Sequence, residues 1–507
     1  MCAVWCRPGG RGAGCLVGDR PTATPAARPA AAARRAVTAR RASDGHRPYP
    51  VRVSTALMTD RYELTMLRAA LQSGAAHRHV VFEVFTRALP PGRRFGVLAG
   101  TGRLLEALAD FHFGPAELDV LRADGVVDEA TAAWLADYRF HGDIHAFAEG
   151  EPFFAGTPVL VVEGTFGEAV LLETLVLSIL NHDSAIAAAA ARMVAAAAAR
   201  PCLEMGSRRT HEAAAVAAAR AAYVAGFTAT SNLEAGRTYG VPGVGTSAHA
   251  FTLAHPSEAE AFAAQVRVLG ADTTLLVDTY DVADGVAAAV AAAGPRLGAV
   301  RIDSGDLAAL ARATRAQLDR LGAPNTRIVA TGDLDEHALA RLASSPLDGY
   351  GIGTSLVTGS GAPTAGFVYK LVEVDGAPVA KRSVGKGTRG GRKRVLRRHD
   401  PAGRAVADIV LTAAAPGPEP TISPDAALSA RWAGAAGSSG VTENSRDREL
   451  LRQLVVGGKL AEEGLVGPAG TARARAHHAQ AFAALPRGAR DVGFGQPCLP
   501  VVHTAGP

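Results

Sequence analysis

The sequence predicts an α/β protein in which an irregular β/α barrel is joined to a β-rich α+β domain. Four short apolar segments are each followed at once by acidic, hydroxyl or glycine residues; they read LLVDTYD, VRIDSGD, IVATGDLDE and GYGIGT and begin at Leu275, Val300, Ile328 and Gly349. Equivalent apolar residues are separated by 25, 27 and 23 positions, which leaves room for one helix and two loops per strand. Parallel barrels bind ligands at the C-terminal ends of such strands. The pattern therefore predicts where a site lies.

The two domains are expected to interleave along the chain. Residues 51–155 and 366–411 carry alternating apolar segments with Gly and Pro turns, typical of a β-rich α+β domain. Residues 156–365 show strand and helix patterns in alternation, which predicts the barrel.

Three further segments complete the division. Residues 1–50 are rich in Arg, Ala and Pro and are predicted to be a disordered tail; a transit peptide or a start codon placed too far upstream are the alternatives. Residues 412–448 are predicted to be a flexible linker. Residues 449–507 are predicted to be a helical extension with helices at Glu449–Val456 and Ala472–Ala484.

Charge and composition narrow the function classes. The net charge is +5, but nine Arg and two Asp in residues 1–50 contribute +7, so the remainder is near −2 and gives no general reason to expect nucleic acid binding. The sequence contains no strongly apolar, uncharged stretch of about 18 residues or more, so it predicts no membrane span. The five cysteines show no paired metal-ligand spacing. We expect a cytoplasmic protein with no membrane and no nucleic acid partner.

Two pairs of carboxylates follow neighbouring predicted strands. Asp278 and Asp281 end the first, and Asp303 and Asp306 end the second. Carboxylates at this edge can hold Mg²⁺ or sugar hydroxyls, or they can cap the following helix. Arg301 lies two residues before Asp303, so both side chains point to the same face.

Two other loops offer groups for phosphate chemistry. Arg208, in EMGSRRTHE, precedes an Ala-rich helix, where guanidinium groups and helix amides can bind phosphate, although a solvated Arg pair is the simpler interpretation. The run from Gly245 through Thr246 to His249 has small residues that let a ligand approach the backbone. A lone histidine is more often structural, and His211 competes for any catalytic role.

A basic run and a glycine loop remain. Lys381–Arg398 contains nine basic residues, no acidic one and no aromatic residue to stack bases, so it is interpreted as a solvated loop or part of a phosphate-rich site. The loop with Gly351, Gly353 and Thr354 ends the last of the four strands, a position that often binds phosphate.

Taken in order, these motifs resemble the nicotinate phosphoribosyltransferase family, which has a type II phosphoribosyltransferase fold. The matching segments run from about residue 55 to 398 and include MTDRYELTML, FTRALPPGRRFGVLAG, TSNLEAGRTYGVPGVGTSAHAF, RIDSGDL and KRSVGKGTRGGRK. The resemblance implies that nicotinate and 5-phosphoribosyl 1-diphosphate give nicotinate mononucleotide and diphosphate in NAD salvage, with ATP hydrolysis coupled through a phosphorylated histidine and with Mg²⁺ present.

The resemblance also implies roles for residues. His249 matches the phosphorylated histidine, and Arg208 and Arg301 match groups around the nicotinate carboxylate and phosphoribosyl moiety. Tyr62 matches a residue that reaches the pyridine ring from a neighbouring subunit, which implies a homodimer. The remaining residues expected to bind substrate are Ser231, Thr246, Asp278, Asp303, Gly351, Gly353 and Thr354, and either aspartate could hold metal.

Ser231 bears on the choice of substrate. The related nicotinamide enzyme carries Asp at this position, and a carboxylate there would repel nicotinate. At about 4 Å and an effective dielectric near 20, two unit charges repel by about 4 kcal/mol. Nicotinamide or quinolinate transfer, or a non-catalytic nucleotide-binding regulator, remain as alternatives.

Overall fold

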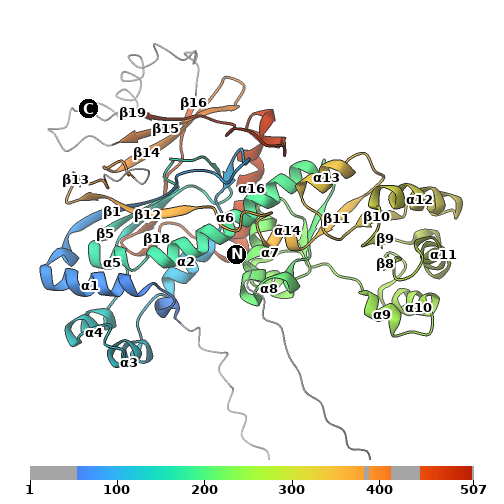
Figure 1. The fold of residues 1–507 in the computed structure, drawn as a ribbon, viewed down its shortest axis with the longest axis horizontal. Helices are drawn as coiled ribbons and strands as arrows, with labels where there is room; N and C mark the ends of the chain where they lie inside the picture. The colour runs from blue at the N-terminus through green and yellow to red at the C-terminus, as the bar shows by residue number, and fades with distance from the viewer. Residues whose placement is uncertain (1–53, 382–386, 413–445, 505–507) are drawn as a thin grey trace, which may run out of the picture. The chain divides into compact units, whose positions relative to one another are not determined.

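The computed structural model describes residues 54–381, 387–412 and 446–504. The predicted tail and nearly all of the predicted linker lie outside these residues. The described residues all belong to one compact unit. The predicted α/β class is confirmed, because a curled all-parallel sheet is accompanied by antiparallel sheets (Figure 1).

The parallel sheet has six strands in the order β7-β6-β11-β10-β9-β8, and every neighbouring pair is parallel. The four segments that end in polar loops are therefore adjacent. The strands are β6 (Cys202–Glu204), β7 (Ala229–Thr230), β8 (Thr274–Leu276), β9 (Ala299–Ile302), β10 (Arg327–Ala330) and β11 (Gly349–Ile352).

Helices connect these strands, as the spacing predicts. They are α7 (Glu212–Val224), α8 (Leu233–Tyr239), α9 (His249–Leu253), α10 (Glu258–Leu269), α11 (Val282–Ala293), α12 (Leu307–Arg320), α13 (Glu336–Leu342) and α14 (Thr354–Val357). The largest buried cluster packs the strands against them, with Leu275, Val300, Ile328 and Ile352 each at most 1% exposed.

The antiparallel sheet joins distant parts of the chain. Its order is β13-β12-β1-β5-β3-β17-β18, so the segment after residue 366 pairs with the N-terminal strand β1. The strands are β1 (His79–Thr86), β3 (Asp143–Ala146), β5 (Leu160–Thr165), β12 (Phe367–Val374), β13 (Ala377–Pro378), β17 (Arg452–Val456) and β18 (Lys459–Leu460). Helix α1 (Arg61–Ser73) buries Leu64 and Leu67 in the same core.

The C-terminal segment differs from its prediction. Glu449–Val456 was expected to be helical but contains β17, and only α16 (Gly467–Ala483) fits the predicted closing helices. Leu454 and Val455 are buried where β17 pairs with β3, an interaction between residues too far apart in sequence for a local pattern to show. The last strand, β19 (Val501–Thr504), pairs with β15 (Ala405–Thr412).

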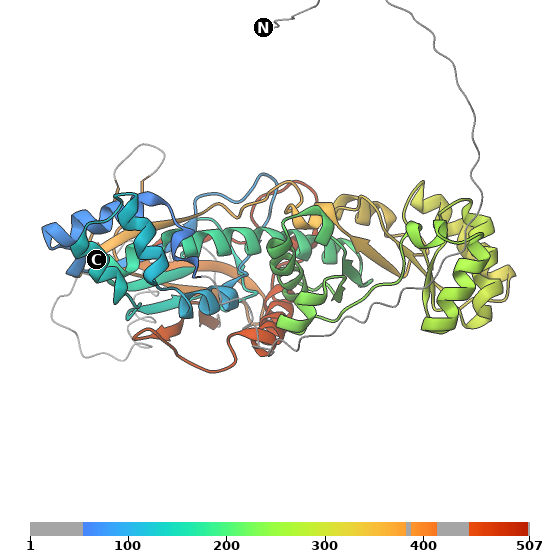
Figure 2. The same cartoon turned by 90° about the horizontal axis from the view of Figure 1, so that it is seen from below.

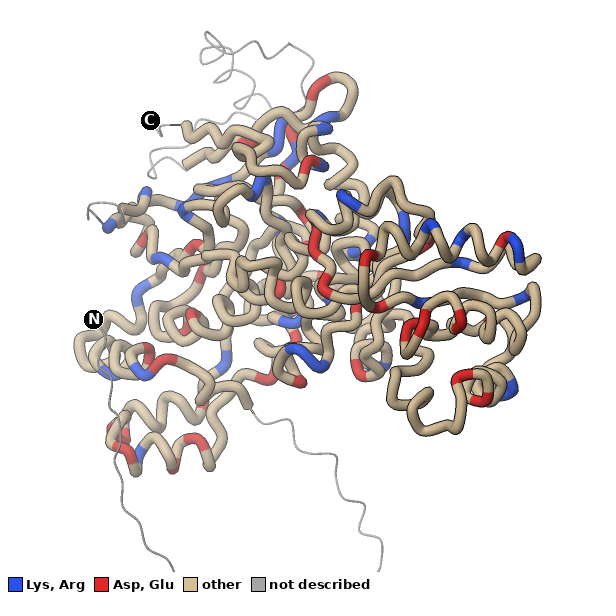
Figure 3. The backbone as a smooth tube through the Cα atoms, turned by 45° about the vertical axis from the view of Figure 1, so that its right-hand side comes forward, with Lys and Arg blue, Asp and Glu red and all other residues tan. Residues whose placement is uncertain are grey.

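The basic run is also different from its prediction. Its described second half forms β14 (Lys393–His399), and three of its basic side chains are buried rather than solvated. Lys393 Nζ lies 2.8 Å from Glu83, and Arg397 lies 2.5 Å from Glu151 and 2.7 Å from Asp408. Glu83 and Asp408 come from other strands and Glu151 from a loop, so the run itself gave no sign of its neutralisation. Basic and acidic positions are interspersed over the described backbone (Figure 3).

Helix α6 (Glu173–Ala196) connects the two regions of sheet. It contacts β2 (Gly96–Val97) and β12 as well as α7 and α13, and it can be followed in Figures 1 and 2. Among the described residues it is the one helix long and apolar enough to cross a membrane, by length and composition only. In its most apolar window 61% is buried inside the protein, which is the situation of a core helix.

Candidate active site

The loops after β8, β9 and β10 are joined by their own carboxylates. Asp278 Oδ2 accepts hydrogen bonds of 2.8 Å from the backbone N–H of Asp303 and from Ser304 Oγ. Asp303 Oδ1 in turn accepts a short hydrogen bond from Thr331 Oγ1. These strand-end loops, called the rim below, therefore form a connected set of polar groups at the C-terminal edge of the parallel sheet.

The two aspartate pairs divide their roles. Asp281 accepts from the backbone N–H groups of Ala283 and Asp284, and Asp306 accepts from those of Ala308 and Ala309, so each caps the next helix. Asp278 and Asp303 make no such cap and link the loops instead. Helix capping thus explains Asp281 and Asp306, whereas Asp278 and Asp303 remain available to contact a ligand.

His249 is the first residue of α9, and it lies beside this rim. Its Nδ1 is 3.2 Å from Thr279 Oγ1, and its Nε2 is 3.8 Å from Asp278 Oδ1. Asp278 Oδ1 is buried and has no hydrogen-bond partner among the described residues. The imidazole is 40% exposed, so a reactant in solvent can reach it.

Arg301 lies on β9 close to both aspartates. Burial lowers the pKa of its guanidinium, the charges of Asp303 and Asp278 oppose that shift, and the charge of Arg208 adds to it. Its Nη2 donates to the carbonyl of Ser247 at 3.1 Å, while Nε is buried without a partner in the described chain. Arg208 is exposed, and its charge is the weakest of these influences on Arg301.

The loop with the small residues spans the two edges of the parallel sheet. Thr230 of β7 exchanges backbone hydrogen bonds with Pro242 and Val244, and the same loop reaches β9 through Ser247 and Arg301. Thr246 is exposed within it. Because the loop crosses the sheet, His249, which follows β7 in the chain, lies at the ends of β8 and β9. The sequence alone does not show that these segments are close.

Glu204 is a site residue that the sequence reasoning missed. It is fully buried at the end of β6, where it accepts from Thr230 Oγ1 and, at 2.5 Å, from the backbone N–H of Gly206. Burial raises the pKa of its carboxyl, although these hydrogen bonds oppose the shift. It holds the loop of Arg208 beside the loop of Ser231. The sequence signal that could have identified Glu204 is an acidic residue at the end of an apolar strand.

The glycine loop after β11 needs its glycines for packing. A Cβ on Gly351 would lie 2.5 Å from Thr331 Cγ2 and 2.7 Å from Met205 Sδ. A Cβ on Gly353 would lie 3.2 Å from the carbonyl oxygen of Met205. Thr354 follows as an exposed residue at the start of α14, where first-turn amides have no intrahelical acceptor. The loop therefore offers amides and a hydroxyl next to Thr331.

A cavity of about 460 Å³ borders this loop. Thr354, Ser355 and Ser360 line it together with the buried side chains of Arg93 and Arg192. Both arginines lie 3.0 Å from one oxygen of Glu336, so two cations share a single carboxylate. Asp335 also lines the cavity, so its two arginines are matched by two carboxylates.

Tyr62 lies elsewhere, on α1. No contact between it and the rim residues is recorded within the described ranges. It is 44% exposed, and burial of the remainder, with Glu173 nearby, raises the pKa of its phenol. Tyr62 and Met66 are both exposed and four residues apart on α1, which places them along one face, and the exposed Met58 precedes the helix. Tyr62 and Met66 form an exposed apolar stripe on α1.

The aspartates fit Mg²⁺ only together with a substrate. The described residues contain no group of three or more His, Cys, Asp or Glu that could hold a metal ion. Mg²⁺ commonly keeps several waters and binds one or two carboxylates plus substrate phosphates. Asp278 Oδ1, which has no hydrogen-bond partner among the described residues, is the oxygen that would serve as such a ligand.

The family model and the sequence relatives described here share one name. The family model described as the nicotinate phosphoribosyltransferase (NAPRTase) N-terminal domain matches residues 57–181. Nicotinate phosphoribosyltransferase pncB1 of Mycobacterium tuberculosis is 62% identical over 368 residues, which are 71% of this chain and 82% of that protein. The Bacillus subtilis nicotinate phosphoribosyltransferase is 37% identical over 359 residues, or 68% and 73% of the two chains.

A solved structure extends the likeness to the fold. The human nicotinic acid phosphoribosyltransferase superposes with a TM-score of 0.71 at 27% identity, covering 88% of this chain and 97% of that one.

Proposed function

This chain belongs to the nicotinate phosphoribosyltransferase family, and from that membership we propose how its rim residues carry out the reaction. The chain is an enzyme with nicotinate phosphoribosyltransferase activity in NAD salvage. The substrates we assign are nicotinate and 5-phosphoribosyl 1-diphosphate, which give nicotinate mononucleotide and diphosphate. The observation that carries the proposal is the cluster of Arg301, Asp278, Asp303 and His249 at the ends of neighbouring parallel strands.

Arg208 and Arg301 are assigned to the anionic groups of the substrates. Two cations close enough to influence one another are stabilised when an anion enters between them, and guanidinium groups bind carboxylate and phosphate in two-point contacts. Gly353 and Thr354 are assigned to a phosphate, with backbone amides and the Thr354 hydroxyl as donors. Asp303, held by Thr331, is assigned to the ribose hydroxyls.

His249 is assigned to ATP. Its Nδ1 is held by Thr279, so Nε2 is the nitrogen left for the γ-phosphorus. The N–P bond forms as the bond from phosphorus to the bridging oxygen breaks, ADP leaves with the electron pair, and water later releases phosphate. The Asp278 carboxylate, 3.8 Å from Nε2, stabilises the positive ring that results. Asp278 would hold Mg²⁺, which would supply charge neutralisation for the phosphates.

Ser231 is assigned to substrate choice. It is exposed and follows β7, where the Ser231 N–H donates to the carbonyl of Glu204 at 2.9 Å, so it is held next to the Arg208 loop. A neutral hydroxyl leaves the negative charge of nicotinate unopposed. Ser231→Asp should raise the KM for nicotinate about 10–100-fold. This increase is smaller than the repulsion of two charges at low dielectric would give, because solvent screens an exposed group. Ser231→Asn is the neutral control.

A homodimer is the proposed assembly, and the site is completed by Tyr62 of the other subunit. The exposed stripe on α1 supports this assembly. Two more exposed apolar residues, Leu233 (86% exposed) and Tyr280 (63% exposed), also support it, because each is two residues from a proposed site residue. Co-expression of Tyr62→Ala and His249→Ala chains tests it. Random pairing in a two-fold dimer should restore roughly a quarter of wild-type coupled activity, and no restoration would contradict a shared site. We propose the cytoplasm as its location, because both phosphorylated substrates are metabolites of the cell interior.

The activity itself is tested by product analysis. Purified enzyme should be incubated with nicotinate, nicotinamide or quinolinate, each with 5-phosphoribosyl 1-diphosphate and with or without ATP. Nicotinate should give nicotinate mononucleotide and should respond to ATP. Release of CO₂ from quinolinate at a comparable rate, or equal use of nicotinamide, would contradict the assignment.

A further inference from the structure

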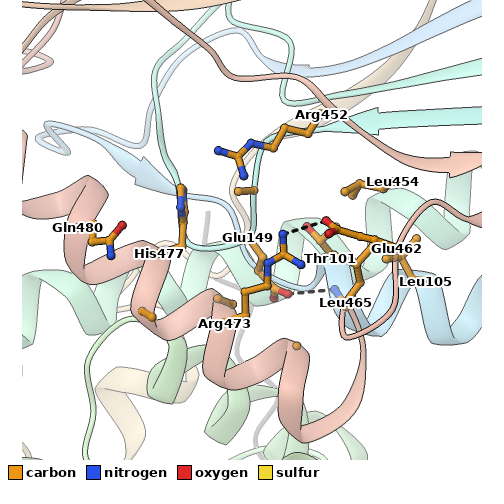
Figure 4. Close-up of a pocket in the computed structure, with 15 residues that line it drawn as sticks. Thr101, Leu105, Glu149, Arg452, Leu454, Glu462, Leu465, Arg473, His477 and Gln480 are labelled. Carbon is orange, nitrogen blue, oxygen red and sulfur yellow. Dashed lines mark hydrogen bonds and ion pairs between the residues drawn. The ribbon is translucent and has the colours of Figure 1, made fainter.

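A second cavity, of about 270 Å³, lies between α2 (Thr101–Ala109), α16 and β17. Figure 4 shows Arg452 of β17 on one side of it and Arg473 and His477 of α16 on the other. None of the residues assigned to the reaction is among those that line it. The cavity is therefore unexplained by the proposed function.

The acidic groups of this cavity are already neutralised. Both oxygens of Glu149 bind the buried Arg220 of α7, and they also accept from the backbone N–H groups of Gly100 and Gly102. Glu462 pairs with Arg473 at 2.8 Å. His477 Nε2 lies 2.6 Å from Glu151. These contacts leave no carboxylate of the lining to bind a further cation.

Two donors in the lining are unused. Arg452 is exposed, and its guanidinium has no ion pair or hydrogen bond to any described residue. Its charge reaches Glu462, whose carboxyl pKa is lowered mainly by the hydrogen bond from Arg473 and more weakly by Arg452. Thr101 is only 4% exposed, and its Oγ1 is buried with no hydrogen-bond partner in the described ranges. A buried hydroxyl without a partner is costly, and an acceptor in the cavity would satisfy it.

The remaining wall is apolar. Leu105, Leu454 and Leu465 line the cavity, and Leu105 and Leu454 are buried. At about 30 Å³ for each non-hydrogen atom, as in a liquid, the volume holds roughly ten such atoms. Apolar walls with a few placed polar groups are typical of small-molecule sites.

We propose that this cavity binds a small organic anion. Its carboxylate or phosphate accepts from Arg452 and Thr101, and its apolar ring or chain packs on Leu105, Leu454 and Leu465. The site is separate from the phosphoribosyl site, and the proposal does not depend on the reaction assigned above.

Isothermal titration with phenyl phosphate, benzoate and inorganic phosphate tests the proposal on the full-length chain. Phenyl phosphate or benzoate should bind with a Kd of about 0.1–1 mM. Arg452→Gln should weaken that binding at least about tenfold. Arg394→Gln removes an arginine of β14 that does not line the cavity, and binding should be unchanged. Any binding at the phosphoribosyl site would persist in all variants and is thereby distinguished.

Thr101→Val keeps the test decisive if Arg452→Gln fails to fold. Because the Thr101 hydroxyl has no partner to lose, this variant should weaken binding about threefold or more without lowering the thermal midpoint. Three results would overturn the proposal: no saturable binding of the organic probes up to about 10 mM, equal binding by wild type and both cavity variants, or inorganic phosphate binding as tightly as phenyl phosphate.

Discussion

The imidazole Nε2 of His249 lies 3.8 Å from Asp278 Oδ1, an oxygen that is buried and unpartnered among the described residues. The other oxygen of the same carboxylate holds the loop after β9. One aspartate thus fixes the rim and also faces the histidine to which we assign phosphoryl transfer.

Replacing Asp278 with Asn should separate these two roles. Asn retains an oxygen that can accept from the backbone of Asp303, so the thermal midpoint should change little. The negative charge beside the imidazole is lost, and kcat for the ATP-coupled reaction should fall about 10–100-fold, as for other groups that orient a reactive residue. Steady-state kinetics and thermal unfolding of the same preparations check both.

Asp281→Asn is the matched control for that variant. Asp281 caps α11 and makes no contact with His249, so kcat should be within about twofold of wild type, and stability should change little because Asn caps a helix about as well as Asp. A similar loss of kcat in both variants would contradict the distinct role of Asp278.

The buried pair of Arg220 and Glu149 should dominate the stability of the contact between α7 and the loop before β4 (Pro152–Phe153). Arg220 is fully buried and Glu149 is 8% exposed. Arg220→Met leaves a carboxylate buried without its partner and should cost about 3–5 kcal/mol. Equilibrium denaturation in urea measures this cost.

Arg78→Gln provides the comparison, because its pair with Asp375 is about half exposed on both sides. An exposed pair is worth about 0–1 kcal/mol. Equal costs for the two arginine variants would contradict the burial argument.

Glu151 should make stability fall in acid. Its burial by itself would raise the pKa of the carboxyl, but His477, Arg397 and Arg448 outweigh this and bring it well below its usual value. A carboxyl with a depressed folded-state pKa contributes stability that is present above its unfolded value, 4.5, and is lost as the pH falls below it. Glu151→Gln should therefore be less stable at neutral pH and lose less stability between pH 5 and about pH 3.

Glu63→Gln should change the pH dependence in the opposite sense. Burial raises the pKa of the Glu63 carboxyl above 4.5 despite hydrogen bonds from Thr174 and Thr59. Its contribution to stability is present below pH 4.5 and is lost as the pH rises through the folded value. Thermal midpoints over a pH series distinguish the two variants, and identical pH profiles would contradict both assignments.

Local pattern was sufficient where a strand and its following loop act together. The four strand ends and the helix-capping residues follow from spacing and residue type, and their physical cause lies within a few residues. What local pattern does not show is which distant groups meet. Lys393 and Arg397 were expected in solvent because Glu83 and Asp408 belong to other strands, and β17 was expected to be helical because β3 lies some 300 residues earlier.

The candidate site shows the same limit. Arg301 and Asp303 could be placed on one strand end from sequence, whereas the crossing of the loop that carries His249 to β8 depends on tertiary hydrogen bonds to Thr230 and Arg301. Without the family resemblance, His249 and His211 could not be ranked. The structure separates them: His211 caps α7 and is 71% exposed, while His249 faces Asp278.

The ratio of ATP hydrolysed to nicotinate mononucleotide formed is the most direct test of a phosphoryl-accepting histidine at the strand ends. It should be measured for wild type, His249→Ala and His211→Ala with nicotinate and 5-phosphoribosyl 1-diphosphate. Wild type and His211→Ala should couple the two reactions, whereas His249→Ala should lose ATP hydrolysis and retain a slow ATP-independent transfer. Undiminished ATP hydrolysis in His249→Ala, with the same ratio as wild type, would contradict the account.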